Sequence, residues 1–306
     1  MNILHMRYAV EVARLGSLNK AAETLLIAQP NISRSIRELE KDLGISIFIR
    51  SSKGMVLTPE GKEFIGYAKG ILKQIDDVEL LYKGGARKKQ KFSISTPHAC
   101  YISEAFAEFS KGLAGGAAEV FYKETDSQST LNALLGNDCR LGIIRYAENF
   151  DKHFKTLLEE KGLCGEPIAT FSYRLIISRE NPLAQKEELS PEDLAPLIEL
   201  SCTDHYVPEL PFSKAAKEAL PHYADRRITT LDRAGRMDLL SENPMTFMWA
   251  SPVSPKMLDR YGLVQRQFAE FKRVYRDVLI YRNGYKLSKL DKLFIAALRD
   301  AQRRIL

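Results

Sequence analysis

A run of polar side chains between residues 29 and 37 has the chemistry needed to read bases in duplex DNA. Glutamine and asparagine can pair with adenine through two hydrogen bonds, and arginine can pair with guanine in the same way. Serine can contact a base edge or a phosphate. The residues of this run that we expect to contact DNA are Gln29, Pro30, Asn31, Ser33, Arg34 and Arg37. The residue types therefore predict a surface that reads the major groove.

These polar residues can act together only if a helix presents them on one side. Ile32, Ile36, Leu39 and Leu43 recur at steps of four, three and four residues, which is the spacing of one buried helix face. A proline near the start of this segment favours the first helical turn, and Gly44 is suited to end the helix. We therefore predict a helix with an apolar inner face and a polar outer face.

Other elements must hold this helix in place. Apolar residues at helical spacing predict a first helix over Ile3–Leu15 and a second over residues 18–26, with Ser17 placed to cap the second. The second and third helices, separated by a short turn, form a helix-turn-helix pattern.

A basic hairpin is expected immediately after the third helix. Residues 47–50 and 55–58 read as two strands around a four-residue turn. This hairpin would form a wing, with Arg50 and Lys53 placed to contact DNA phosphates.

Over some forty positions this region resembles the LysR-type transcriptional regulators. The matching positions are Ala21-Ala22, Leu25, Gln29-Pro30, Ile32-Ser33-Arg34, Ile36, Leu39-Glu40, Leu43-Gly44, Phe48, Arg50, Leu57-Thr58 and Gly61. One departure is Ala28, where the family often carries serine or threonine. Its loss removes a possible helix cap worth about 0.5–2 kcal/mol and a possible phosphate contact. The resemblance implies a regulator that binds double-stranded DNA and responds to a small effector.

The distribution of charge agrees with a DNA-binding N-terminal part. Residues 1–91 hold 16 Lys and Arg against 10 Asp and Glu, whereas residues 92–306 hold 29 of each kind. The whole net charge of +6 therefore lies beside the expected DNA reader, where phosphate binding would release counterions. A membrane surface could attract the same charge, but the sequence has no lipidation motif, basic amphipathic anchor or membrane-length apolar run.

A long helix is expected to follow the wing. Thr58, Pro59 and Glu60 are typical of a helix start. Beyond them, apolar residues recur at alternating steps of four and three, at Phe64, Ala68, Ile71, Ile75, Val78 and Tyr82. This period of 3.5 predicts pairing with a second copy, and docking of the helix on its own domain is the alternative. The resemblance implies a homodimer on an inverted-repeat promoter site, and tetramers, which the family commonly forms.

The C-terminal part alternates strand-like and helix-like segments, which predicts an α/β fold. Gly84 and Gly85, followed by charged residues, read as a hinge. We predict a mixed fold: a helix-rich winged helix-turn-helix domain, a long linker helix, and an α/β domain of two Rossmann-like subdomains, as the resemblance implies. The predicted limits are 1–58 for the DNA-binding domain, 59–90 for the linker and hinge, and 91–306 for the effector domain, with 91–167 plus 270–306 as subdomain I and 168–269 as subdomain II.

Hydroxyl-bearing residues follow several predicted strands of this domain. Ligands of α/β sheets bind beyond the carboxyl ends of strands, so these residues would line a cleft between the subdomains. The candidate effector-binding residues are Ser95, Thr96, His98, Ser127, Ser201, Thr203 and Thr246. Hydroxyls and helix-start amides suit a small anion. Each residue alone is also explained as a helix cap or turn former.

Other classes of function find little support in the sequence. It contains no nucleophile elbow, zinc-protease motif or phosphate-binding glycine loop, so we expect no enzyme, cofactor or catalytic residue. Cys100, Cys139, Cys164 and Cys202 lack metal-ligand spacing and read as reduced thiols of a cytoplasmic protein. An enzyme or a solute-binding module using the same cleft, with an N-terminal segment serving assembly, is the alternative.

Overall fold

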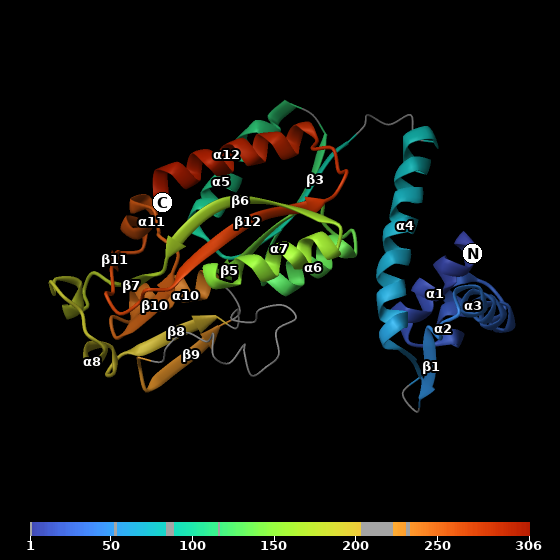
Figure 1. Ribbon diagram of the computed structural model, residues 1–306, viewed down its shortest axis with the longest axis horizontal. Coiled ribbons are helices and arrows are strands. Elements are labelled where there is room, and N and C mark those ends of the chain that lie inside the picture. Colours follow the sequence, from blue (N-terminus) through green and yellow to red (C-terminus); the bar gives the residue numbers. More distant parts are fainter. Residues whose placement is uncertain (1, 52–53, 84–88, 116, 203–222, 231–232) are drawn as a thin grey trace. The chain divides into compact units, whose positions relative to one another are not determined.

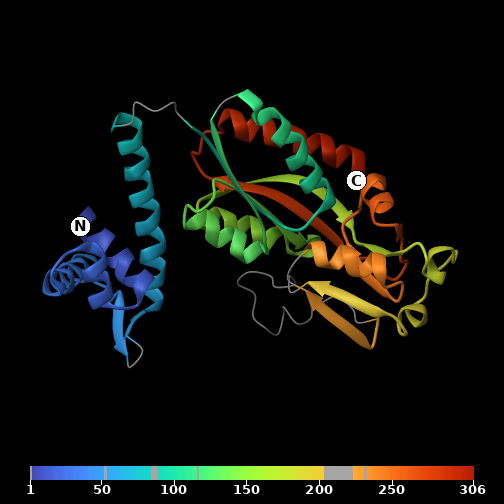
Figure 2. The ribbon, with the colours of Figure 1, turned by 180° about the vertical axis from the view of Figure 1, so that it is seen from behind.

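The chain divides into two compact units, residues 1–88 with 135–138 and residues 89–134 with 139–306. The first unit is mostly helical and the second contains two five-stranded sheets with helices, which confirms the predicted mixed fold class (Figures 1 and 2). In this computed structural model the described residues are 2–51, 54–83, 89–115, 117–202, 223–230 and 233–306. No helix within these ranges has the length and apolar content needed to cross a membrane.

The first unit is a helix-turn-helix with a two-stranded wing. Its elements are α1 (Ile3–Leu15), α2 (Leu18–Leu25), α3 (Gln29–Leu43), β1 (Phe48–Ser51), β2 (Gly54–Leu57) and α4 (Pro59–Lys83). The ends of α1 and α3 lie at glycines with left-handed backbone, at φ 63° for Gly16 and 70° for Gly44. The core joins the inner faces of α1, α2, α3 and α4 to the start of β1. Glycines thus end these helices, and one shared core holds the elements together, as the residue pattern predicts.

The apolar stripe of α4 is divided between two roles. Ala68 is fully buried in the core of its own unit, and Phe64 packs against that core. Further along the helix, the Ile71 and Val78 side chains are exposed, by 38% and 52%. The side chain of Tyr82 lies outside the described residues. The first turns of the stripe therefore dock on their own unit, which was the alternative to pairing. Beyond them, α4 keeps an exposed apolar surface.

The first sheet of the second unit has the strand order β4-β3-β5-β12-β6. Its strands are β3 (Gln90–Thr96), β4 (Ala118–Glu124), β5 (Leu141–Ala147), β6 (Leu163–Ser172) and β12 (Val274–Arg282). Strands β3, β4 and β5 are parallel, and β12 is antiparallel to both of its neighbours. Helices α5 (Cys100–Lys111) and α12 (Lys289–Ile305) cover one face, and α6 (Ser127–Leu135) and α7 (Asp151–Glu160) cover the other (Figure 1).

The second sheet has the order β11-β7-β10-β8-β9. Its elements are β7 (Arg174–Ser178), α8 (Pro191–Leu194), β8 (Ile198–Cys202), β9 (Arg226–Thr230), α10 (Arg233–Glu242), β10 (Thr246–Ala250), α11 (Pro255–Arg260) and β11 (Leu263–Arg266). Short 3-10 turns lie at 112–115, 148–150 and 182–184. One hydrophobic core continues from the first sheet into the second, through aromatic residues such as Phe171, Trp249 and Tyr275.

The chain crosses between the sheets twice. Strand β6 pairs with β12 as far as Ser172, so the first crossing lies at Tyr173, a few residues beyond the predicted limit at 168. The return crossing lies between β11 and β12, and the ring of Tyr275, near the start of β12, stacks on Tyr173 at a centroid distance of 4.3 Å. The predicted limit lies inside β6. The alternation of buried and exposed residues along a strand predicts which face is buried, but it does not show to which sheet the end of a long edge strand belongs.

Candidate nucleic-acid interface and candidate effector site

Among the described residues, the start of α3 has no side-chain cap. Ala28 occupies the N-cap position with extended backbone and makes no side-chain hydrogen bond to the helix. Pro30 lies in the first turn, where its missing N–H costs nothing. Ile32, Ile36 and Leu39 are buried in the core of the first unit and fix the orientation of the helix. The first turn of α3 therefore presents polar side chains at the surface, and its Asn31 N–H donates to the Ala28 carbonyl oxygen at 3.0 Å.

We expect Ala28→Ser to raise the free energy of unfolding of the first unit by about 1 kcal/mol. A serine hydroxyl would give the Asn31 N–H a second acceptor beside the residue-28 carbonyl oxygen, to which it donates at 3.0 Å. Calorimetry of the full chain would detect this as a higher transition temperature of the first unit. Ala269→Ser, at an exposed turn of the second unit, is the control. An unchanged transition temperature would mean that the hydroxyl does not cap α3.

The structure leaves most of the predicted DNA-contacting residues at the surface. Pro30, Asn31, Arg34, Arg37 and Arg50 are exposed, and Gln29 is half-buried. The Arg37 guanidinium folds back along α3 and donates to the Ser33 carbonyl oxygen at 3.3 Å and to the Ser33 Oγ at 3.4 Å. Arg34 instead donates from Nε to the Glu38 Oε1 at 2.9 Å. The two arginines of α3 are thus held in different ways.

Ser33 departs from the predicted outer face. Its side chain is buried, with 9% of the residue exposed, and its hydroxyl lies next to Arg37. The buried face of α3 is wider than the stripe from Ile32 to Leu43, because Ser33 lies one turn before Ile36 on the same side. Its expected contact with a base edge would need the Arg37 side chain to move.

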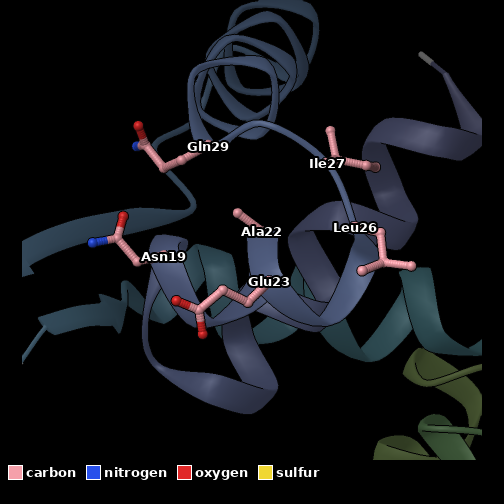
Figure 3. A pocket seen from close by; sticks show the side chains of 6 residues that line it. All are labelled: Asn19, Ala22, Glu23, Leu26, Ile27 and Gln29. Carbon is pink, nitrogen blue, oxygen red and sulfur yellow. The ribbon is translucent and has the colours of Figure 1, made fainter.

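A hollow of about 360 Å³ opens between α2 and the start of α3 (Figure 3). It is lined by Asn19, Ala22, Glu23, Leu26, Ile27 and Gln29. The amides of Asn19 and Gln29 point toward the same side, so α2 adds a polar group that the sequence reasoning missed. Leu26 is 92% exposed and has left-handed backbone at φ 53°, which leucine rarely adopts. A polar residue at the first turn of α2 is the signal that could have identified Asn19.

The wing is tied to the helices by hydrogen bonds between a side chain of α3 and the backbone of the wing. Arg50 faces Met55 across the hairpin, and Lys53 lies outside the described residues. The Glu40 Oε1 accepts from the backbone N–H groups of Ile47 at 2.7 Å and Phe48 at 3.1 Å, which ties α3 to β1. Glu40 thus positions the wing, a role that its place in the sequence pattern does not reveal.

In the second unit, the end of β3 has two different kinds of hydroxyl. Ser95 is buried, and its Oγ lies 3.2 Å from the Thr130 Oγ1 of α6, so it bridges sheet and helix. The Thr96 Oγ1 is buried and has no hydrogen-bond partner among the described residues. The His98 Nδ1 lies 2.8 Å from the Glu124 Oε2 at the end of β4. The Thr96 hydroxyl is therefore the group at this edge without a partner among the described residues, whereas the Ser95 hydroxyl and the His98 Nδ1 are occupied.

Other predicted effector residues have internal partners. The Ser127 hydroxyl donates to the Arg145 carbonyl oxygen and accepts from the Arg145 N–H, each at 2.9 Å. The Ser201 Oγ lies 3.1 Å from the Thr229 Oγ1 on β9. Thr203 lies outside the described residues. Ser127 and Ser201 thus join neighbouring elements at the carboxyl ends of strands, and their hydroxyls are shared with the fold.

Thr246 was expected at the cleft and lies at the opposite edge of its sheet. It is the first residue of β10 and faces Ile198, the first residue of the parallel strand β8. Its hydroxyl donates to the Asn243 carbonyl oxygen at 2.7 Å, which closes the turn after α10. The prediction failed because strand direction decides which edge a terminal residue occupies, and the composition of a strand does not reveal its direction.

Comparison with known proteins identifies the first unit. Residues 3–62 match the family described as bacterial regulatory helix-turn-helix protein, lysR family. The transcriptional regulator BenM of Acinetobacter baylyi is 42% identical over 83 residues, which cover 27% of each chain. The regulator MetR of Escherichia coli is 25% identical over 197 residues, which cover 64% of this chain and 58% of MetR. These matches span about a quarter and somewhat over half of the relatives' lengths.

Solved structures share the fold over the whole chain. Full-length LysG from Corynebacterium glutamicum, solved with bound effector Arg, has a TM-score of 0.61 and 16% sequence identity, covering 100% of this chain and 99% of LysG. At residues 3–62 the chain therefore carries the helix-turn-helix domain of the bacterial LysR family, and its fold is similar to that of LysG.

Proposed function

We propose that this chain is a DNA-binding transcription regulator whose activity is set by a small-molecule effector. The observation that carries the proposal is the match of residues 3–62 to the LysR-family helix-turn-helix, on a unit that exposes Asn31 and Arg34 at the start of α3. In this reading α3 enters the major groove, Arg50 and Lys53 of the wing contact phosphates, and the protein acts in the cytoplasm.

A second copy of the chain is part of the proposal. The exposed Tyr67, Ile71 and Val78 give α4 an apolar surface that pairing with another α4 would bury. Two-fold pairing would place two copies of α3 on successive major-groove faces of an inverted-repeat site. Association of such dimers into tetramers extends the same proposal. The limits 1–58, 59–90 and 91–306 would then separate DNA reading, pairing and effector response.

The effector would bind at the carboxyl ends of β3, β4 and β8. Helix α5 starts directly beyond β3, and its N-cap residue, Ala99, provides no side-chain cap. Free N–H groups at a helix start attract anions. The buried Thr96 hydroxyl, which has no partner in the part of the chain that the structure describes, offers a further hydrogen bond. Both features suit an effector with an anionic group. The bound arginine of LysG is a precedent for a small effector on this fold.

Salt-dependent DNA binding tests the regulator directly. The full chain is titrated onto a labelled duplex from its own promoter region. The logarithm of its binding constant should fall linearly with the logarithm of the salt concentration. We expect Arg34→Ala to weaken specific binding about 10-fold to 100-fold, because a bidentate contact to guanine discriminates by about 1–3 kcal/mol. Arg50→Ala should weaken binding to all sequences alike and lower the salt slope by about 1.

Lys256→Ala, which removes an exposed charge from the second unit, is the control and should leave DNA affinity unchanged. Affinity that does not depend on salt, or that survives Arg34→Ala, would contradict the proposed DNA-binding function.

A further inference from the structure

Glu38 lies beside the arginine that the proposed function directs at bases. The two residues are four apart on α3, and the Arg34 Nε donates to the Glu38 Oε1 at 2.9 Å. The Arg34 side chain is 80% exposed and that of Glu38 is 48% exposed. Within the described part of the chain, the terminal nitrogens of Arg34 donate no hydrogen bond to the protein. The carboxylate thus holds one edge of the guanidinium and leaves the outer edge available.

The other arginine of α3 makes a different set of contacts. Arg37 donates through Nε to the Ser33 carbonyl oxygen and through a terminal nitrogen to the Ser33 hydroxyl. One of its terminal nitrogens is therefore occupied by its own helix. Bidentate recognition of guanine needs two N–H groups of the guanidinium pointing outward together. Arg34 meets this requirement with both of its terminal nitrogens, whereas Arg37 would first have to leave Ser33.

Glu38 is also close to α1. Its second oxygen, Oε2, lies 3.8 Å from the Nε2 of His5, whose side chain is 16% exposed. The carboxylate therefore lies between the exposed guanidinium of Arg34 and the largely buried ring of His5. An exposed ion pair one turn apart on a helix adds little to stability. The pair instead determines which way the Arg34 guanidinium points and how strongly its positive charge attracts phosphates.

We propose that Glu38 is a specificity-determining residue that positions Arg34 for guanine. It occupies the Nε edge, so the terminal amino groups face outward as a pair. Its negative charge also weakens the attraction of Arg34 to phosphates, which are the same at every base pair. Glu38 thus lowers binding to unrelated DNA and keeps binding to the proper site. This inference rests on the proposed DNA-binding function.

Selection from a randomised duplex pool, followed by sequencing, tests the inference with the full chain. The wild-type protein should enrich a motif containing a guanine whose preference disappears in Arg34→Ala. Glu38→Ala should reduce the preference for that guanine about tenfold, and raise affinity for unrelated DNA. Glu38→Gln should keep most of the preference, because its amide oxygen can still accept from the Arg34 Nε, and should also raise affinity for unrelated DNA.

Glu63→Gln removes the same charge from an exposed position of α4 and should leave the selected motif unchanged. If the wild-type protein enriches no motif, the proposed DNA-binding function fails. If it does enrich a motif, and Glu38→Ala keeps full preference at the position that Arg34→Ala loses, the role assigned to Glu38 is wrong while the function stands. Equal melting temperatures of the Glu38 variants and the wild type would separate this role from a purely structural one.

Discussion

Replacing Asp277 with alanine should lower the free energy of unfolding of the second unit by about 3–5 kcal/mol, because it leaves a buried arginine without its counter-charge. Asp277 is fully buried, and the Arg145 side chain is 10% exposed. The Arg145 Nε and one terminal nitrogen each donate to Asp277 at 2.7 Å. Tyr101 of α5 donates its hydroxyl to the same carboxylate at 2.6 Å.

The surroundings of this pair explain why the loss should be large. Arg145 and Asp277 face each other across β5 and β12, and the guanidinium lies 4.8 Å from the centre of the Phe171 ring. Burial raises the pKa of Tyr101 well above its usual value, and the Asp277 charge raises it further. Burial acts to lower the pKa of Arg145, but the Asp277 carboxylate acts together with Tyr173 and Tyr101 to raise it, and the pKa is raised overall. Arg145 therefore keeps its charge and depends on Asp277.

Urea unfolding followed by tryptophan fluorescence would measure the effect, since Trp249 is the only tryptophan and lies in the second unit. Tyr101→Phe removes one hydrogen bond and should cost only about 1.5–3 kcal/mol. The double variant Arg145→Met with Asp277→Leu should recover most of the loss, because it removes both charges together. A loss below about 1 kcal/mol for Asp277→Ala would mean that water reaches Arg145 in the folded protein.

The parts of the fold that could be predicted from the sequence are those formed by contacts between residues close together in the chain. The Ser17 hydroxyl accepts from the Lys20 N–H at 3.4 Å, and the Thr58 hydroxyl accepts from the Gly61 N–H at 2.8 Å, as expected for helix caps. Such contacts join residues three apart, so composition and spacing reveal them. The DNA-reading helix was predictable for the same reason, because its stripe, proline and terminal glycine all lie within one short segment.

The remainder depends on groups that the fold brings together from distant parts of the chain. Arg145 and Asp277 are 132 residues apart, and no local pattern pairs them. Thr246 was misplaced because its role depends on the direction of a strand, and Ser33 because its exposure depends on the width of a buried helix face. Ala68 shows a third limit of prediction from sequence. An apolar residue at helical spacing can pack in the core of its own unit or against a partner copy, and the spacing is the same in both cases.

A methyl group at Gly61 should destabilise the first unit by about 3 kcal/mol or more, because the site is overpacked against backbone. An ideal Cβ on Gly61 would lie 2.8 Å from the carbonyl carbon and 2.9 Å from the Cα of Ile47, and nearer still to the Ile47 oxygen. Ile47 has little freedom to move away. Its N–H donates to Glu40 at 2.7 Å, and its carbonyl oxygen accepts from the Thr58 N–H at 3.1 Å.

Gly66→Ala is a matched control for this clash, because it makes the same chemical change in the same helix. A Cβ at Gly66 would meet no atom within 4 Å, so alanine there should stabilise α4 by about 0.5–1 kcal/mol through its higher helix propensity. Amide hydrogen exchange of α3 and α4 peptides, measured on the full chain, should show faster exchange for Gly61→Ala and slower exchange for Gly66→Ala. DNA affinity should fall only for Gly61→Ala, since the clash separates α4 from the segment that joins α3 to the wing. Equal exchange in both variants would show that the Ile47 segment can move aside, and that the close approach of α4 does not hold the DNA-reading helix in place.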